Sequence, residues 1–474
     1  MTPDRAQRML TPLAAAAGVG ALLFLLTAGP GRTVTPRLPD RATMERRKAP
    51  AATESRNPGM LTPGPGQPGP DVGAWPQFRG PNRNGKRSEA DGLYVEWPEA
   101  GPEELWRVEV GEGHAGPVVH AGRVYVLDYD REAEEDALRC LSLADGREIW
   151  RYSYSVSVKR NHGMSRTVPA VSDGLVVSLG PKCDVLCVAA DSGEKQWALD
   201  LVEAYGTVVP PWYAGQCPLI EDGRLILAPG AEPLMVALDA VSGEEIWRTP
   251  NPGDDGMTHS SIVALPHPSG RQYVYCTTRG VVGVRASDGA LLWRFPEWKI
   301  SIANVPSPVV LDERTLLFSG GYNAGAAVVR VEESDEGFAV TELHRVGPRV
   351  FGSDQHTPVL RNGVVWGVLP GPKDSLGCFD PESGRLVWTG EPADRFGLGP
   401  YLLADDLLYV LQDQKCELSL YRLQDGGAER LARAAVLDGH DAWAPMALAG
   451  GRLLLRDLTQ LVCLRVGDDN GRTP

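Results

Sequence analysis

The feature that most constrains the fold is a short pattern that occurs five times: Asp or Ser, then Gly, three residues, then Trp. The copies are Asp145–Trp150, Ser192–Trp197, Ser242–Trp247, Asp288–Trp293 and Ser383–Trp388. The first four tryptophans lie 47, 50 and 46 residues apart. A period of this length, with short apolar runs around each copy, is typical of a β-propeller or another repeat array.

Each copy is predicted to be a hairpin between the last two strands of a repeating unit. The Gly supplies a positive φ for a tight turn, and the Asp or Ser side chain can cap the turn. The Trp follows on the outgoing strand, where a large ring can pack against the neighbouring unit. Four strands in each period of about 45 residues predict an all-β propeller of four-stranded blades.

The period continues where the Trp is missing. Between Trp293 and Trp388 lie 95 residues, which leaves room for a further unit with strands at 326–331 and 338–343. Another unit follows at 418–431. The sequence therefore predicts eight blades.

The last blade is predicted to be completed from the front of the ring. Leu461–Leu464 ends that unit without an outgoing strand, whereas Glu104–Val108 carries Trp106 with no hairpin before it. Trp106 lies 44 residues before Trp150, which is one period. Pairing of these two segments would close the ring and leave no open sheet edge.

The chain of 474 residues divides into five predicted parts. They are a signal peptide or membrane anchor over 1–29, a Pro-rich disordered linker over 30–73, an N-terminal extension over 74–103, the propeller over 104–467 and a disordered tail over 468–474. The linker assignment depends on nine prolines and no apolar periodicity.

The uncharged, mostly apolar stretch Leu10–Gly29 predicts export, with a single membrane anchor and a ring on the periplasmic face of the cell envelope. A cleaved signal peptide is the alternative. The arginines that follow, from Arg32 to Arg47, instead favour a cytoplasmic ring under the positive-inside rule.

Charge and cysteine usage exclude several classes of function. The formal net charge of −14 argues against nucleic-acid binding, which needs clustered Lys and Arg. Four of the eight cysteines share the apolar third-strand position and are predicted to be small buried hydrophobes: Cys140, Cys187, Cys378 and Cys463. Cys183 and Cys187 have no matching second pair, so no metal site is predicted.

The unit Met235–Trp247 resembles the repeat of the PQQ-like (pyrroloquinoline-quinone-type) β-propeller family, whose signature is an apolar strand, Asp-x-x-Thr/Ser-Gly, three residues and Trp. The signature Asp is Asp239 here and recurs at Asp380. The motif Trp75–Gly85 looks like the start of a membrane-anchored, planctomycete-type bacterial branch of this family. The resemblance covers residues 74–466 and implies the propeller fold.

Two functions are implied by the resemblance, because the family contains quinoprotein alcohol dehydrogenases and non-catalytic members such as the barrel-assembly scaffold propeller of the outer membrane. The dehydrogenases share a disulfide between adjacent cysteines, acidic and Asn calcium ligands and an Asp base. This chain has no adjacent cysteines, no matching motif for the other groups and no Cys-x-x-Cys-His haem site.

We therefore expect a membrane-tethered, extracytoplasmic binding or scaffold module that is not an enzyme and needs no cofactor. Its expected partner is an envelope protein or peptide, or a small polar ligand. The alternative is an alcohol or sugar dehydrogenase that binds PQQ with Ca²⁺.

A ligand site, if present, is expected at the mouth of the central channel, because the first strand of each blade lies innermost. The residues just before these strands include His114, Arg166, Thr167, Gln216, His259, Ser260, Asn304, Gln355, His356 and Trp443. Together they predict a pocket for an anionic or sugar-like ligand. The alternative is that each side chain bonds to a neighbouring loop or to buried water. No nucleophile–base pair is recognisable, so no catalytic residue is predicted.

Overall fold

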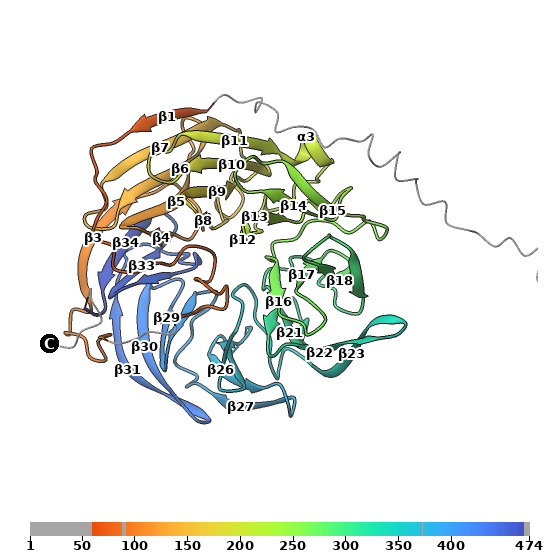
Figure 1. The fold of residues 1–474 in the computed structure, drawn as a ribbon. Helices are drawn as coiled ribbons and strands as arrows, with labels where there is room; N and C mark the ends of the chain where they lie inside the picture. The colour runs from red at the N-terminus through yellow and green to blue at the C-terminus, as the bar shows by residue number, and fades with distance from the viewer. Residues whose placement is uncertain (1–58, 88–91, 372, 469–474) are drawn as a thin grey trace, which may run out of the picture. The chain divides into compact units, whose positions relative to one another are not determined.

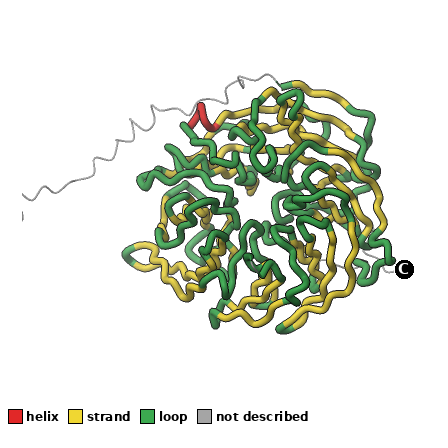
Figure 2. Tube along the Cα trace, turned by 180° about the vertical axis from the view of Figure 1, so that it is seen from behind, coloured by secondary structure: helices red, strands yellow, loops and turns green. Residues whose placement is uncertain are grey.

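The computed structural model describes residues 59–87, 92–371 and 373–468, all of which belong to the compact unit Ala49–Pro474. They form eight sheets that surround a central axis as blades (Figure 1). Strands and loops make up nearly all of the ring, and the one helix among these residues, α3 (Leu201–Tyr205), lies on its outer side (Figure 2). The predicted all-β, eight-bladed propeller is confirmed.

Blades one to seven each contain four strands that follow one another along the chain. Blades one and two contain β4 (Val118–His120), β5 (Arg123–Asp130), β6 (Glu135–Ser142), β7 (Glu148–Ser155), β8 (Ala170–Ser172), β9 (Leu175–Leu179), β10 (Asp184–Ala189) and β11 (Lys195–Asp200). Blades three and four contain β12 (Leu219–Glu221), β13 (Arg224–Leu227), β14 (Met235–Asp239), β15 (Glu245–Thr249), β16 (Val263–Leu265), β17 (Gln272–Thr277), β18 (Gly280–Arg285) and β19 (Leu291–Phe295). Blades five and six contain β20 (Val309–Val310), β21 (Thr315–Gly320), β22 (Gly325–Ser334), β23 (Gly337–Val346), β24 (Val359–Arg361), β25 (Val364–Val368), β26 (Leu376–Asp380) and β27 (Arg385–Thr389). Blade seven contains β28 (Tyr401–Ala404), β29 (Leu407–Leu411), β30 (Glu417–Gln424) and β31 (Gly427–Ala435).

The eighth blade joins the two ends of the ring, as predicted. It contains β32 (Ala447–Ala449), β33 (Arg452–Arg456) and β34 (Gln460–Arg465), and its outermost strand is β3 (Glu103–Glu109). β3 pairs antiparallel with β34 and places Trp106 opposite Cys463. The backbone groups of β34, which would otherwise form an open sheet edge, are therefore hydrogen-bonded to β3.

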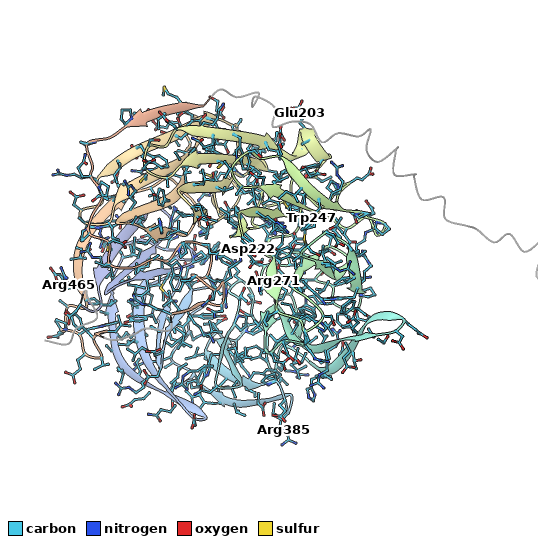
Figure 3. The ribbon with its side chains drawn as sticks, viewed as in Figure 1. Glu203, Asp222, Trp247, Arg271, Arg385 and Arg465 are labelled. Carbon is cyan, nitrogen blue, oxygen red and sulfur yellow. The ribbon has the colours of Figure 1, made fainter. Side chains whose placement is uncertain are left out.

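The repeated Gly and Trp form one contact between successive blades. A Cβ atom on Gly243 would lie 2.7 Å from the ring of Trp197, and one on Gly289 would lie 2.4 Å from the ring of Trp247. Both glycines also have a positive φ, 72° and 75°. A residue larger than Gly at either position would therefore strain the turn and clash with the tryptophan of the preceding blade. Figure 3 places Trp247 where blades three and four meet.

Within each blade, the tryptophan faces a small residue on the third strand, which leaves room for the indole. The pairs are Trp150 with Cys140, Trp197 with Cys187, Trp247 with Ala237, Trp293 with Gly283 and Trp388 with Cys378. The first four of these tryptophans are buried, whereas Trp388 is half-buried. All eight cysteines are buried and free of disulfides.

The fifth blade keeps this contact with a different side chain. His344 lies opposite Val328 on β22, at the register position of the tryptophan. Its Nε2 is 2.7 Å from the carbonyl oxygen of Glu382, and its ring would be 3.0 Å from a Cβ on Gly384, both in blade six. An imidazole bonded to the next hairpin therefore replaces the indole, which explains why the repeat is interrupted in the sequence.

The prediction of a disordered linker that reaches residue 73 is wrong for residues 59–73. β1 (Met60–Pro63) pairs with β7 as a fifth strand of blade one. Beyond it, Gly64 and Gly66 donate backbone hydrogen bonds of 2.8 Å to Ile149 and Glu148. A Cβ on Gly64 would lie 2.1 Å from a backbone oxygen, so this glycine permits close packing and does not mark flexibility.

The rest of the predicted linker, the apolar stretch of residues 10–29 and the tail after Asp468 lie outside the described residues. Within the ranges that the structure describes, no helix has the length and apolar character that a membrane crossing requires.

Candidate functional site

Residues 75–87, here called the axial segment, cross the central channel. Trp75 exchanges two backbone hydrogen bonds with Val119 in blade one, and the carbonyl of Pro76 accepts from Val171 in blade two. At the other end of the axial segment, β2 (Lys86–Arg87) pairs parallel with β28 in blade seven. The axial segment therefore contacts the innermost strands of blades that are far apart in the sequence.

Two arginines, of which Arg83 is buried and Arg79 is half-buried, fix the axial segment to two further blades. Arg83 donates to the carbonyl oxygens of Cys217 and Pro218 in blade three. Arg79 donates to those of Thr357 and Pro358 in blade six. Burial lowers the pKa of both guanidinium groups to about 10, so both stay charged at neutral pH.

The axial segment divides the channel into two cavities. One, here called the axial cup, has a volume of about 340 Å³. Trp75, Phe78 and Arg79 contribute to its lining, together with residues that precede the innermost strands. The second cavity, of about 540 Å³, is lined by residues of β12, β16 and β20 and by the opposite side of the axial segment, including Asn82 and Arg83. The axial cup is thus closed on one side.

Six of the ten predicted site residues line the axial cup, and four do not. The six are His114, Arg166, His259, Gln355, His356 and Trp443. Of the other four, Thr167 donates to the carbonyl of Leu179, and Gln216 bonds both backbone groups of Ala228. Ser260 and Asn304 are buried beside the cup. For Thr167 and Gln216, bonding to neighbouring backbone is therefore the observed role.

Apart from Trp443, the sequence analysis missed the aromatic lining of the cup. Trp75, Phe78, Trp212, Tyr322 and Tyr401 all line it. The first two belong to the motif Trp75–Gly85, whose arginines and aromatic rings were the available signal. The other three lie in inter-strand loops or on an inner strand, and nothing in their spacing indicates a shared cavity.

Four histidines line the cup, and three of them, His114, His259 and His356, are neutral at physiological pH. Burial lowers the pKa of His114 to about 3, and the positive charge of Arg166 adds to this shift. Burial likewise lowers the pKa of His259 and of His356 to about 4, with contributions from Arg166 and Arg79 respectively. Each ring therefore offers one N–H donor and one acceptor.

Aromatic stacking fixes part of the wall. The ring of Trp443 stacks on His114 with centroids 4.6 Å apart, and its indole N–H donates to Asp413 over 3.1 Å. Trp212 packs against His259 with centroids 6.1 Å apart. The cup thus combines flat apolar surfaces with a guanidinium group and neutral imidazoles.

A buried carboxyl group lies behind the wall. Asp136 accepts hydrogen bonds from Tyr154, at 2.8 Å, and from Ser165, at 2.9 Å. Ser165 precedes Arg166 in the chain, so this network supports the loop that carries the arginine. Burial raises the pKa of Asp136 to about 7, although both hydrogen bonds act in the opposite direction.

This shift predicts a pH-dependent stability. The folded state binds the proton of Asp136 more tightly than the unfolded state, so its contribution is fully present below about pH 4 and is lost as the pH rises through 7. From pH 5 to 8, wild type should lose roughly 2 kcal/mol of unfolding free energy relative to Asp136→Asn. Urea unfolding at both pH values measures this. Because both proteins share the histidines, equal pH dependence in the two would contradict the prediction.

Comparison with known proteins relates the chain to a single family. A family model described as outer membrane protein assembly factor BamB matches residues 134–390, which is more than half of the chain. The BamB protein of Burkholderia pseudomallei (strain K96243) is 23% identical over 371 residues, which are 77% of this chain and 78% of that protein. The BamB protein of Nitrosomonas eutropha is 25% identical over 297 residues, 62% of this chain and 56% of that protein.

Solved structures share the fold at low sequence identity. A europium-containing methanol dehydrogenase has a TM-score of 0.59 at 12% identity, covering 83% of this chain and 90% of its own. BamB from Moraxella catarrhalis has a TM-score of 0.53 at 12% identity, covering 77% of this chain and 99% of its own. The resemblance to PQQ-like propellers is confirmed by the family match, and these structures support the fold.

Proposed function

Because the chain belongs to the family described as outer membrane protein assembly factor BamB, we propose that it is a non-catalytic scaffold that binds a protein of the outer-membrane assembly machinery. The family match is the observation that carries this proposal. The ring itself suits the role, since a closed propeller presents rigid loops on two faces.

The proposal places the ring in the cell envelope, on the periplasmic side. Its support is the name shared by the relatives and the apolar stretch Leu10–Gly29, which suits export. A membrane tether through that stretch is part of the proposal. The proposal involves no cofactor and no metal.

The face onto which the axial cup opens is the proposed docking surface. Val208 and Ile302 lie in the loops that also supply Trp212 and Ala303 to the cup, and their side chains are 76% and 53% exposed. Tyr322, on the same face, is 49% exposed. Exposed apolar side chains that gather on one face and are surrounded by polar groups are typical of protein-binding surfaces.

A photo-cross-linking amino acid at Val208 tests this surface. Val241 is the matched control, because it is also a largely exposed valine but lies in the hairpin before β15, at the end of the strands opposite to the cup face. We expect a cross-linked outer-membrane assembly protein, identified by mass spectrometry from envelope membranes, at position 208 and not at 241. No such product at 208, or equal products at both positions, would count against the proposal.

The alternative function is a PQQ-dependent dehydrogenase, which the fold permits. The residues at the axis do not suit its Ca²⁺, because calcium takes oxygen ligands and no Asp or Glu is among the described residues that line the cup. Titration of the purified protein with PQQ and Ca²⁺, with dye reduction by alcohols as the readout, separates the two functions. The scaffold proposal expects no dye reduction.

A further inference from the structure

The axial cup has the chemistry of a binding site for a small organic anion. We propose that it binds a monocarboxylate that carries a flat apolar ring, and that Arg166 receives the carboxylate. This inference goes beyond the scaffold role, and either can fail without the other.

The charge of the cup is the first reason. Two arginines, Arg79 and Arg166, line it, and no Asp or Glu does so among the described residues. Neither arginine forms an ion pair in this part of the structure. A half-buried positive charge without a carboxylate partner is costly, and an anion that enters the cup would offset that cost.

Only one of these two guanidinium groups has a buried nitrogen without a hydrogen-bond partner. Arg79 uses its nitrogens on four backbone carbonyls, those of Arg83, Asn84, Thr357 and Pro358. Arg166 donates to loop carbonyls through a single nitrogen, Nη2, while its Nε is buried and has no hydrogen-bond partner. One available guanidinium fits one carboxylate, which accepts hydrogen bonds from two nitrogens of an arginine at once.

Unpartnered imidazole nitrogens are the second reason. His114 is 6% exposed, and both of its ring nitrogens are buried without a hydrogen bond of normal geometry, although the backbone of His162 lies close enough to act on the ring. Nε2 of His259 and Nε2 of His356 are also buried without a partner. Buried polar groups are normally hydrogen-bonded. Several unpartnered nitrogens around one cavity therefore indicate that a polar ligand supplies their missing hydrogen bonds. Since these rings are neutral, they can donate to a carboxylate oxygen without a change of charge.

The aromatic lining of the cup favours a ligand whose uncharged part is a flat ring. Trp443 and Trp212 contribute indole rings to the wall, and Trp75 and Phe78 contribute rings from the axial segment. Such surfaces favour an aromatic body that stacks in an offset or edge-to-face manner. A volume of about 340 Å³ lies at the low end of the range for small-molecule pockets.

The same features argue against a sugar and against a peptide segment. A site for several hydroxyl groups needs several side-chain amides or carboxylates, and Gln355 is the one such residue among the described lining. The axial segment closes the cup on one side, so an extended chain could not pass through it. A small carboxylic acid with one ring is compatible with both the composition and the closed shape of the cup.

Calorimetric titration of the purified full chain with benzoate and with benzamide tests the proposal. The two probes have the same ring and nearly the same shape, but benzamide has no charge. We expect benzoate to bind at least tenfold more tightly than benzamide and than acetate. Equal affinity for benzoate and benzamide, no benzoate binding at 10 mM (roughly the weakest affinity that such a site would have), or tenfold tighter binding of inorganic phosphate would overturn the assignment.

Two variants locate the site. Arg166→Gln should weaken benzoate binding at least tenfold and leave benzamide binding unchanged. Arg160→Gln is the control, because Arg160 lies in the same loop but is 52% exposed, pairs with Glu112 and does not line the cup. Wild-type affinity for benzoate in Arg166→Gln, or an equal loss in Arg160→Gln, would refute the role of Arg166. The comparison of probes on wild type decides the charge requirement even if Arg166→Gln does not fold.

Discussion

Replacement of Trp247 by Ala should lower the free energy of unfolding by about 3–5 kcal/mol, the usual cost of removing a large aromatic side chain from a core. The indole is 7% exposed, donates to the carbonyl of Ala286 over 3.2 Å and packs on Gly289 of the next blade. The substitution therefore leaves a cavity between two blades and removes the indole hydrogen bond to the Ala286 carbonyl, which keeps its hydrogen bond from Arg224. Chemical denaturation of wild type and variant measures the difference.

Ile246→Ala is the matched control for this experiment. Ile246 is the preceding residue on β15, but its side chain is 46% exposed on the other face of the strand. Its replacement should cost about 1 kcal/mol or less. Similar losses for the two variants would show that the contact between blades is not what stabilises the ring.

Replacement of β3, residues 103–109, by a Gly/Ser segment of equal length should abolish cooperative unfolding and cause aggregation. The change removes the pairing with β34 and the hydrogen bond from Trp106 to the carbonyl of Leu143 in blade one. The eighth blade would then present an open, apolar edge, and the hairpin of blade one would lose its contact with Trp106. Thermal unfolding and size-exclusion chromatography report both effects.

The same replacement in β1, Met60–Pro63, is the control. β1 also pairs with the outer strand of a blade, but its four residues are exposed and it does not close the ring. We expect a monomeric protein with a melting temperature close to that of wild type. A cooperative, monomeric β3 variant would show that the ring does not depend on this closure.

The amino-acid sequence by itself determined the repeating unit and the closure of the ring. A Gly with positive φ before an outgoing Trp is a local requirement, so each copy is visible within about ten residues of chain. Trp106, which has no hairpin before it but lies one period before Trp150, identified the strand that completes the last blade. The fifth blade was recoverable only from spacing, because His344 replaces the indole and keeps its place through a hydrogen bond that no local pattern encodes.

Composition alone misassigned residues 59–73. Gly and Pro are frequent both in flexible linkers and where backbone must approach backbone, and only the neighbours of Gly64 and Gly66 distinguish the two cases.

The complete lining of the axial cup could be recognised only in the tertiary structure. The sequence placed polar residues before the inner strands, but the part of the cup that closes it comes from the axial segment, whose partners Thr357 and Pro358 lie more than 270 residues away. The neutrality of His114, His259 and His356 likewise follows from burial and from the nearby charges of Arg79, Arg166 and Arg456. Because this burial depends on the closed ring, it cannot be inferred from the sequence of a single repeat.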